Sequence, residues 1–224
     1  AILLDMAGPS FFGVEGWKLA PGHFAERHGL IIIIALGESI VAIGAGVEIG
    51  VDAGVVVAAV LGVAVAAGLW WLYFDYVAIV AERRLENAEA GREQNAVARD
   101  SFSYLHFPMV AGIVLIALGM KKTLGHVDDP LKAVPAVALL GGTALYLLAH
   151  VAFRWRNIHR LSRQRVVAAV ALLALIPVGS ELDALLLLAV VTAVLIALIV
   201  YEVVRFAELR DRLRHQVAGH PAAD

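Results

Sequence analysis

The chain has 224 residues, of which 61% are hydrophobic and 17% charged, and its formal net charge is −2. A soluble domain is roughly half apolar and about a quarter charged, so this composition, with a mean hydropathy of +0.81, indicates an integral membrane protein. The lack of cysteine excludes disulfides and thiolate chemistry, and the lack of any nucleic-acid-binding motif predicts no nucleic-acid partner.

Residues 1–28 form an amino-terminal segment without the basic start of a signal peptide. Its first part, residues 1–12, has the composition expected at the end of a further membrane helix that begins upstream. We predict a single transmembrane domain over residues 1–224, with a cytoplasmic segment over 1–28, a helix bundle over 29–204 and a cytoplasmic tail over 205–224.

Six apolar stretches follow in chain order, and an all-α bundle of about six transmembrane helices is predicted. A bilayer core of about 30 Å requires about 20 helical residues. The fifth stretch is shorter, and we expect Arg163 and Arg165 to extend it by snorkelling, with a re-entrant segment as the alternative. The predicted spans are Gly29–Val47, Gly54–Val80, Ser101–Met120, Ala133–Phe153, Val166–Val178 and Ala184–Val204.

The basic residues separate into two groups under this topology. All but three of the 18 lysine and arginine residues lie on the side of the two chain ends, and Lys121, Lys122 and Lys132 lie on the other side. Because positive charge is retained on the cytoplasmic side, both termini are predicted to be cytoplasmic. Residues 81–99 and 202–215 are predicted to be solvated helical extensions, the first turning near Gly91, with an anionic-lipid or partner site as the alternative.

The first span carries an acid near its middle, Glu38, and an ionisable group is costly inside a membrane. Arg27 precedes it by about three helical turns on the same face, and the small residues Gly37, Ser39 and Gly44 lie beside it. We therefore predict that Glu38 points into the bundle. A low-dielectric site favours the protonated carboxyl group, which suits proton exchange, and a structural hydrogen bond is the alternative.

Three further spans each carry a polar residue that we predict to be buried. Asp75 lies in the second span, His106 in the third and His150 in the fourth, where Tyr146 precedes it by one turn. Pro108 lacks an N–H group and frees a carbonyl one turn earlier, so a kink or a polar cavity is predicted beside His106.

Together these residues predict a polar cavity that opens to the cytoplasm and closes near Glu38. The alternative for each histidine is an interfacial position or a hydrogen bond within the bundle. The alternative for Asp75 is an ion pair with a nearby arginine. The metal-capable groups of residues 23–28 match no recognised site, so neither a metal nor a cofactor is predicted, and the aromatic run 70–73 is assigned to an interfacial belt or packing face. The candidate proton- or substrate-binding residues are Glu26, Arg27, His28, Glu38, Asp75, His106, Tyr146 and His150.

Residues 23–42 read His-Phe-Ala-Glu-Arg-His-Gly-Leu-Ile-Ile-Ile-Ile-Ala-Leu-Gly-Glu-Ser-Ile-Val-Ala. The elements Glu-Arg-x-Gly-Leu and Leu-Gly-Glu-Ser-Ile, with Trp-Trp-Leu-Tyr-Phe-Asp at 70–75, resemble the bacterial low temperature requirement A (LtrA) protein family. The resemblance implies a multi-pass protein of the bacterial cytoplasmic (inner) membrane, and a longer chain with an additional membrane half upstream. It points to Glu26, Arg27, Gly37, Glu38 and Asp75 without assigning them chemistry.

Three functions stay open. The first is a proton-coupled transporter of an unknown small solute, with Glu38 exchanging a proton and Asp75 and the histidines as relay or ligands. The second is a membrane-embedded enzyme acting on a lipid or isoprenoid, and the third is a stress-related membrane protein without turnover. The lack of a nucleophile constellation favours a protein that is not an enzyme. The predicted partners are the lipid bilayer and an unknown small-molecule or lipid substrate, and the many glycine and alanine residues also allow a homo-oligomer.

Overall fold

The structure is a computed structural model, and it describes residues 19–47, 50–75 and 77–206. Within these ranges the chain folds into helices, which confirms the predicted all-α class. The predicted amino-terminal segment up to residue 18 and the tail beyond residue 206 lie outside the described residues. In chain order the elements are α2 (Pro21–Gly44), α3 (Ala53–Phe74), α4 (Val77–Glu86), α5 (Arg92–Val97), η1 (Ala98–Tyr104), α6 (His106–Gly125), α7 (Ala133–Ile158), α8 (Arg163–Ala174), α9 (Ile176–Gly179) and α10 (Ala184–Arg205).

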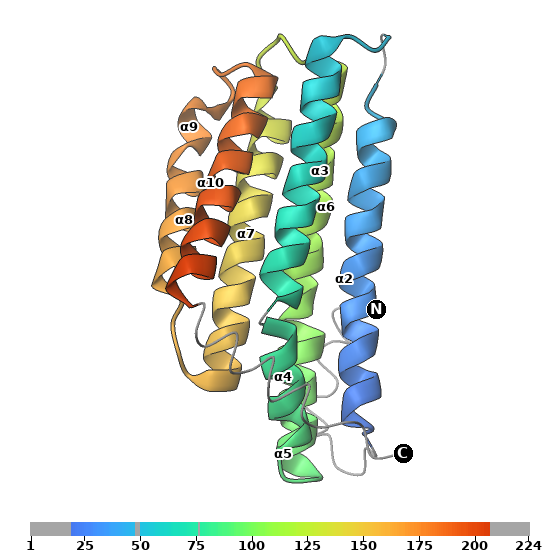
Figure 1. Cartoon of the computed structure of the whole chain (residues 1–224), viewed down its shortest axis with the longest axis vertical. Helices are drawn as coiled ribbons and strands as arrows, with labels where there is room; N and C mark the ends of the chain where they lie inside the picture. Colours follow the sequence, from blue (N-terminus) through green and yellow to red (C-terminus); the bar gives the residue numbers. More distant parts are fainter. Residues whose placement is uncertain (1–18, 48–49, 76, 207–224) are drawn as a thin grey trace.

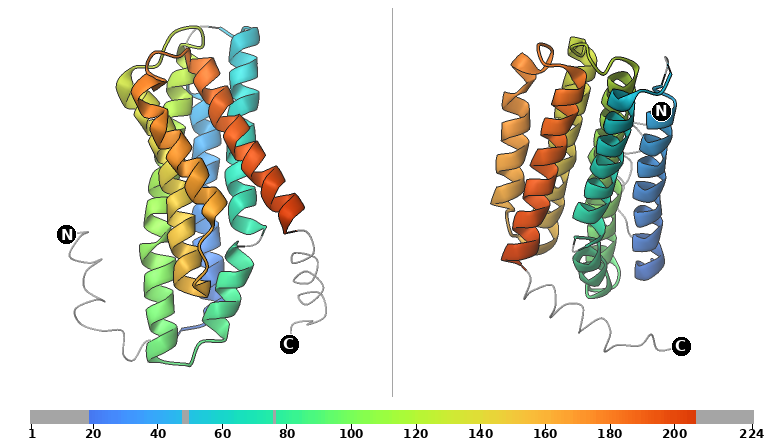
Figure 2. Two further views of the ribbon diagram at one scale, coloured as in Figure 1. Left: turned by 90° about the vertical axis from the view of Figure 1, so that its left-hand side faces the viewer. Right: turned by 45° about the horizontal axis from the view of Figure 1, so that its top comes forward.

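The long helices lie side by side in one bundle, with α2 at one flank and α8 at the other (Figures 1 and 2). The chain crosses the bundle from α2 to α3 and α4, back through α6, and then through α7, α8 with α9, and α10 (Figure 1). Both ends of the described chain lie toward the same end of the bundle as the α4–α5 connection (Figure 1). We call this the arginine-rich end, after Arg84, Arg92, Arg99, Arg156 and Arg160.

The outward faces of the helices are suited to lipid. Large side chains such as Ile34, Val60 and Val200 are 65%, 63% and 55% exposed, an apolar surface that a bilayer would cover. The predicted fifth span forms α8 and the short α9, which together run beside α7 and α10 (Figure 1). By length and composition, five helical segments of the described chain are able to cross a membrane: Pro21–Gly44, Ala53–Glu86, Arg92–Gly125, Ala133–Ile158 and Ala184–Arg205.

The third pass begins with an irregular turn. The segment η1 is a π-helix, and at its end the N–H of Leu105 donates to the carbonyl of Asp100 at 3.2 Å. The regular helix α6 then starts at His106 and has Pro108 in its first turn. The predicted burial of His106 is confirmed, since it is 3% exposed. The kink or polar cavity predicted beside it stays a prediction.

The second pass is described as two helices on either side of residue 76, which lies outside the described residues. α3 ends at Phe74, Asp75 is its C-cap residue, and α4 begins at Val77. The guanidinium of Arg165 donates to the Leu72 carbonyl, near the end of α3, at 3.3 Å. Beyond α4 the chain turns as predicted at Gly91, whose φ of 100° suits glycine.

The helices α6 and α7 pack with their backbones in close contact. A Cβ atom added to Gly112 would lie 2.8 Å from the carbonyl oxygen of Gly142, and one added to Gly142 would lie 2.9 Å from that of Gly112. About two turns after Gly112 in α6, a Cβ added to Gly119 would lie 2.6 Å from the Cβ of Leu139 on α7. Small residues allow membrane helices to approach this closely, and the approach brings the histidines of α6 and α7 into one cluster.

Candidate functional site

Tyr73 and His106 form the centre of a buried polar cluster in the arginine-rich half of the bundle. The phenol oxygen of Tyr73, on α3, lies 2.7 Å from Nε2 of His106, on α6. The other ring nitrogen of His106, Nδ1, lies 3.1 Å from the carbonyl oxygen of Ser101 in η1. Because a carbonyl oxygen only accepts, Nδ1 must carry the proton, and Nε2 accepts the hydroxyl of Tyr73.

Two further histidines share this arrangement. The Nδ1 of His28 lies 2.8 Å, and that of His150 3.1 Å, from the backbone carbonyl one turn earlier in the same helix. In all three histidines the backbone uses the Nδ1 proton, so Nε2 is the basic nitrogen. The ring of His28 lies 5.1 Å from that of His106, and the ring of His150 lies 5.9 Å from that of Tyr73. Two further bases therefore lie around the Tyr73–His106 pair.

His150 adds a deeply buried base to the cluster. It is fully buried, and its Nε2 has no hydrogen-bond partner among the residues that the structure describes. Tyr146 packs against it with ring centroids 4.4 Å apart, and the Tyr146 hydroxyl donates to the Leu69 carbonyl at 2.7 Å. The predicted burial of His150 in the fourth span is thus confirmed. An unpaired basic nitrogen in the interior is costly, and such groups are typical of functional sites.

An ion pair that the sequence did not predict lies beside the cluster. Arg165 on α8 donates to both carboxylate oxygens of Glu202 on α10, at 2.9 and 2.8 Å. The prediction that Arg165 snorkels outward is wrong, because its side chain is 4% exposed and its other partner is the Leu72 carbonyl at the end of α3. Glu202 was assigned to a solvated extension, and its signal in the sequence is an acid within the last turn of an otherwise apolar helix.

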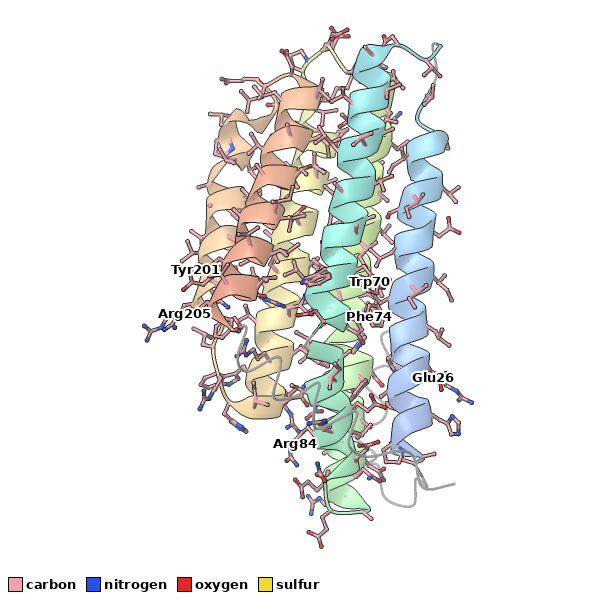
Figure 3. All side chains as sticks on the ribbon, in the orientation of Figure 1. Glu26, Trp70, Phe74, Arg84, Tyr201 and Arg205 are labelled. Atoms are coloured by element: carbon pink, nitrogen blue, oxygen red, sulfur yellow. The ribbon has the colours of Figure 1, made fainter. Side chains whose placement is uncertain are left out.

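A groove of about 650 Å³ lies between α2 and the α3–α4 pair. Aromatic rings of Tyr73, Phe74 and Phe102 line its buried part, and the carboxylates of Glu26 and Glu82 line its exposed part. Figure 3 shows Phe74 on the α3 side and Glu26 on the α2 side of this region. Tyr73 belongs to both features, since it lines the groove and its hydroxyl binds His106.

Glu38 lies outside this cluster. Its side chain is exposed on the outward face of α2, as is that of Ile34. A Cβ atom on the adjacent Gly37 would meet no atom within 4 Å, so no helix of the described chain packs there. The prediction that Glu38 points into the bundle is therefore wrong. The inward face of α2 includes Leu36 and Ser39, because that side buries more apolar surface against α3 and α6.

The structure separates the remaining candidates. Arg27 is exposed in the first part of α2, and Glu26 lines the groove with its carboxylate 3.6 Å from Nδ1 of His23. Asp75 is half-buried at the junction of α3 and α4. Among the described residues no group of three or more His, Cys, Asp or Glu side chains is placed to hold a metal ion. The cluster thus contains His28, His106, Tyr146 and His150 from the sequence prediction.

Carboxylates of α5 and η1 pair with two arginines at this end of the bundle. Arg84 on α4 donates to Glu93 on α5 at 2.6 Å, and Arg156 on α7 donates to Asp100 in η1 at 3.0 Å. These pairs join the α4–α5 turn and the π-helix to the rest of the bundle. They also direct two guanidinium groups away from the groove, whose charged lining residues are acidic apart from the ionisable imidazole of His23.

Apolar outward faces, helices of spanning length and an interior cluster of histidines and tyrosines together define an integral membrane protein of the polytopic helix-bundle class. The chain belongs to the bacterial low temperature requirement A protein (LtrA) family, which matches residues 1–200. The resemblance that residues 23–42 predicted is therefore confirmed.

An uncharacterized protein of Rhizobium meliloti (strain 1021) is 32% identical to the chain over 126 residues. The match covers 56% of this chain and 30% of the relative, so the chain matches less than a third of that protein's length. No solved structure shows significant similarity to the chain.

Proposed function

We propose that the protein is a proton-coupled carrier of a small solute, in which the Tyr73–His106 pair exchanges the proton. The observation that supports this proposal is the position of Tyr73 between two features. Its ring lines the groove, and its hydroxyl lies 2.7 Å from Nε2 of His106. One hydrogen bond therefore separates the occupant of the groove from a buried base. The proton role predicted for Glu38 passes to this pair, because Glu38 is exposed away from it.

The hydrogen bond between Tyr73 and His106 couples the binding of a proton to the binding of a solute. When Nε2 of His106 takes up a proton, it becomes a donor and no longer accepts the hydroxyl of Tyr73. Loss of this bond frees the Tyr73 side chain to move, and because its ring lines the groove, the affinity of the groove for a solute changes with it. Conversely, a solute that engages Tyr73 leaves Nε2 unpaired and changes its affinity for a proton. Each ligand alters the affinity for the other by the same factor.

The half of the bundle away from the arginine-rich end supports a carrier rather than an open channel. Its buried hydroxyls, including those of Thr123, Thr143 and Thr192, each donate to a carbonyl of their own helix. Among the described residues the polar cluster therefore does not continue through that half. A carrier exposes its site to one side at a time, whereas a channel needs a lined path across the membrane.

The groove does not favour an enzyme that acts on an anionic lipid head group. Such an enzyme needs a cation beside its acid, and Arg84 is instead paired with Glu93 at 2.6 Å. Arg27 is exposed and is not among the residues that line the groove. Glu26 and Glu82 would repel an anionic group there.

Proteoliposomes that contain a pH-sensitive dye test the proposal. A panel of cationic, anionic and neutral solutes is added outside, and proton movement is followed with and without the protein. We expect at least one solute class to drive proton movement, and His106→Gln to reduce its rate by roughly tenfold or more. The matched control is His126→Gln, because His126 is exposed at the opposite end of α6. If no solute class moves protons, the carrier proposal is wrong.

A further inference from the structure

The groove between α2 and the α3–α4 pair combines carboxylates at its exposed part with aromatic rings at its buried part. We infer that it binds an organic cation with apolar substituents, and that this cation is the substrate class of the carrier. The assignment of this cation as a substrate rests on the proposed carrier function, whereas the assignment of a binding site rests on the groove itself. Its volume of about 650 Å³ is that of a small-molecule site.

The charges around the groove select a cation. Glu82, on α4, is half-buried in one wall, and Glu26 faces the groove from α2. Two further carboxylates, those of Glu86 and Glu26, act on the Glu82 carboxylate. A cation bound between α2 and α4 would replace this repulsion by attraction. An anion would add another like charge.

The basic residue that lines the groove, His23, does not neutralise this wall. His23 lies 3.6 Å from the Glu26 carboxylate, but the side chains of His23 and Glu26 are 82% and 67% exposed. An ion pair so open to solvent is weak. Glu82 is farther inside than Glu26, so it is expected to contribute more to the binding of a cation that also reaches the aromatic rings.

The buried part of the groove suits apolar substituents around a cationic centre. The rings of Tyr73 and Phe74 meet at a centroid distance of 4.7 Å in an edge-to-face arrangement, and Phe102 lines the same space. Aromatic faces attract quaternary cations, most strongly where water is excluded. Leu30 and Ile33 complete an apolar lining that a bare metal ion would not use. Ammonium and phosphonium ions with alkyl or aryl groups match both parts.

Two ions of the same shape and opposite charge test the inference. The full chain in lipid nanodiscs is equilibrated by dialysis with tetraphenylphosphonium or with tetraphenylborate, and empty nanodiscs give the partition into lipid. We expect saturable binding of the phosphonium to the protein and none of the borate. Glu82→Gln should weaken phosphonium binding about tenfold, and the more exposed Glu26→Gln about twofold. Glu181→Gln is the matched control, since Glu181 is exposed in the α9–α10 turn at the far end.

The outcomes separate this inference from the carrier proposal. Equal binding of both ions, binding no greater than that of empty nanodiscs, or unchanged binding in Glu82→Gln would each overturn the cation site. Proton movement driven only by anionic or neutral solutes would overturn the substrate class and leave the carrier standing. Phosphonium binding in a protein that moves no protons with any solute would keep the site and refute the carrier.

Discussion

Arg165 and Glu202 approach to 2.8 Å between α8 and α10, where their side chains are 4% and 16% exposed. Gln164 also donates to Glu202 at 3.0 Å, and Arg165 donates to the Leu72 carbonyl at 3.3 Å. One guanidinium group therefore connects the last helix, the short α8 and the end of α3.

Replacing one member of this pair should be more harmful than replacing both. Glu202→Leu leaves the guanidinium of Arg165 buried without its counter-charge, so the free energy of unfolding should fall by about 3–5 kcal/mol. Adding Arg165→Met should restore most of that loss, because the charge that needs a partner is gone. Unfolding of both variants in mixed micelles of dodecyl maltoside and dodecyl sulfate measures the difference. Equal losses in the single and double variants would contradict the expectation.

Tyr73→Phe keeps the aromatic ring and removes the hydroxyl. It leaves Nε2 of His106 buried without its partner, which should lower the free energy of unfolding by about 1–3 kcal/mol. The proposed coupling passes through this hydroxyl, so solute-driven proton movement should also be lost. Tyr201→Phe is the control, because Tyr201 is 52% exposed on α10 (Figure 3). Full proton movement in Tyr73→Phe would show that coupling bypasses the pair.

His150→Leu separates a structural from a functional histidine. The Nε2 of His150 has no partner among the described residues, and leucine, which is of similar size, removes this nitrogen together with the Nδ1 bond to a carbonyl of the same helix. We expect the free energy of unfolding to stay within about 1 kcal/mol of the wild type or to rise. Proton movement should nevertheless decrease if this nitrogen receives a proton from the cluster. A variant that is destabilised and fully active would mean that His150 serves packing alone.

Glu38→Leu tests whether the outward face of α2 takes part in function. The exposed carboxyl group lies on an apolar helix face, so leucine should favour membrane insertion of α2 by about 3 kcal/mol. Insertion of the helix into microsomal membranes, followed by a glycosylation reporter, gives this number. Solute-driven proton movement should be unchanged, because the Tyr73–His106 pair is untouched. Loss of proton movement would return the proton role to Glu38.

Gly112→Ala tests the contact between α6 and α7. The added methyl group would lie 2.8 Å from the Gly142 carbonyl oxygen, so we expect a loss of about 1–3 kcal/mol in the free energy of unfolding. Gly37→Ala is the matched control, because a Cβ there meets nothing within 4 Å. Alanine is the better helix former, so this control should gain up to about 1 kcal/mol. Similar effects at both positions would show that the close approach is unimportant for stability.

Hydropathy predicts the positions of the helices in the sequence well. It predicts less well which side of each helix faces the interior of the bundle. The predicted starts of the fourth and sixth spans, Ala133 and Ala184, are also the first residues of α7 and α10. The prediction of the inward face of α2 was wrong, because the small residues beside Glu38 suggested close packing there. Bulky apolar side chains lie on both sides of that helix, so its pattern does not tell a neighbour from lipid.

The candidate site was predicted in part for a related reason. His106, Tyr146 and His150 stood out because polar groups are rare in apolar spans, and the structure does bury them. Arg165 and Glu202 are separated by 37 residues, and their pairing depends on how α8 and α10 lie in space. In the sequence, Tyr73 belongs to an aromatic run that is typical of a membrane interface. Only the short distance between its hydroxyl and Nε2 of His106 shows its polar role.

The backbone contact at Gly112, Gly119 and Gly142 constrains how the protein can change shape. Helices that meet without side chains between them have little room to slide or tilt against each other. α6 and α7 should thus travel as one rigid body, carrying His106 and His150 together. Any rocking motion that exposes the groove to the other face of the membrane must then occur where side chains form the contact, as between α2 and α3. Hinges are to be sought in the connections around this pair, and a spin-label distance from α6 to α7 should stay constant through the transport cycle.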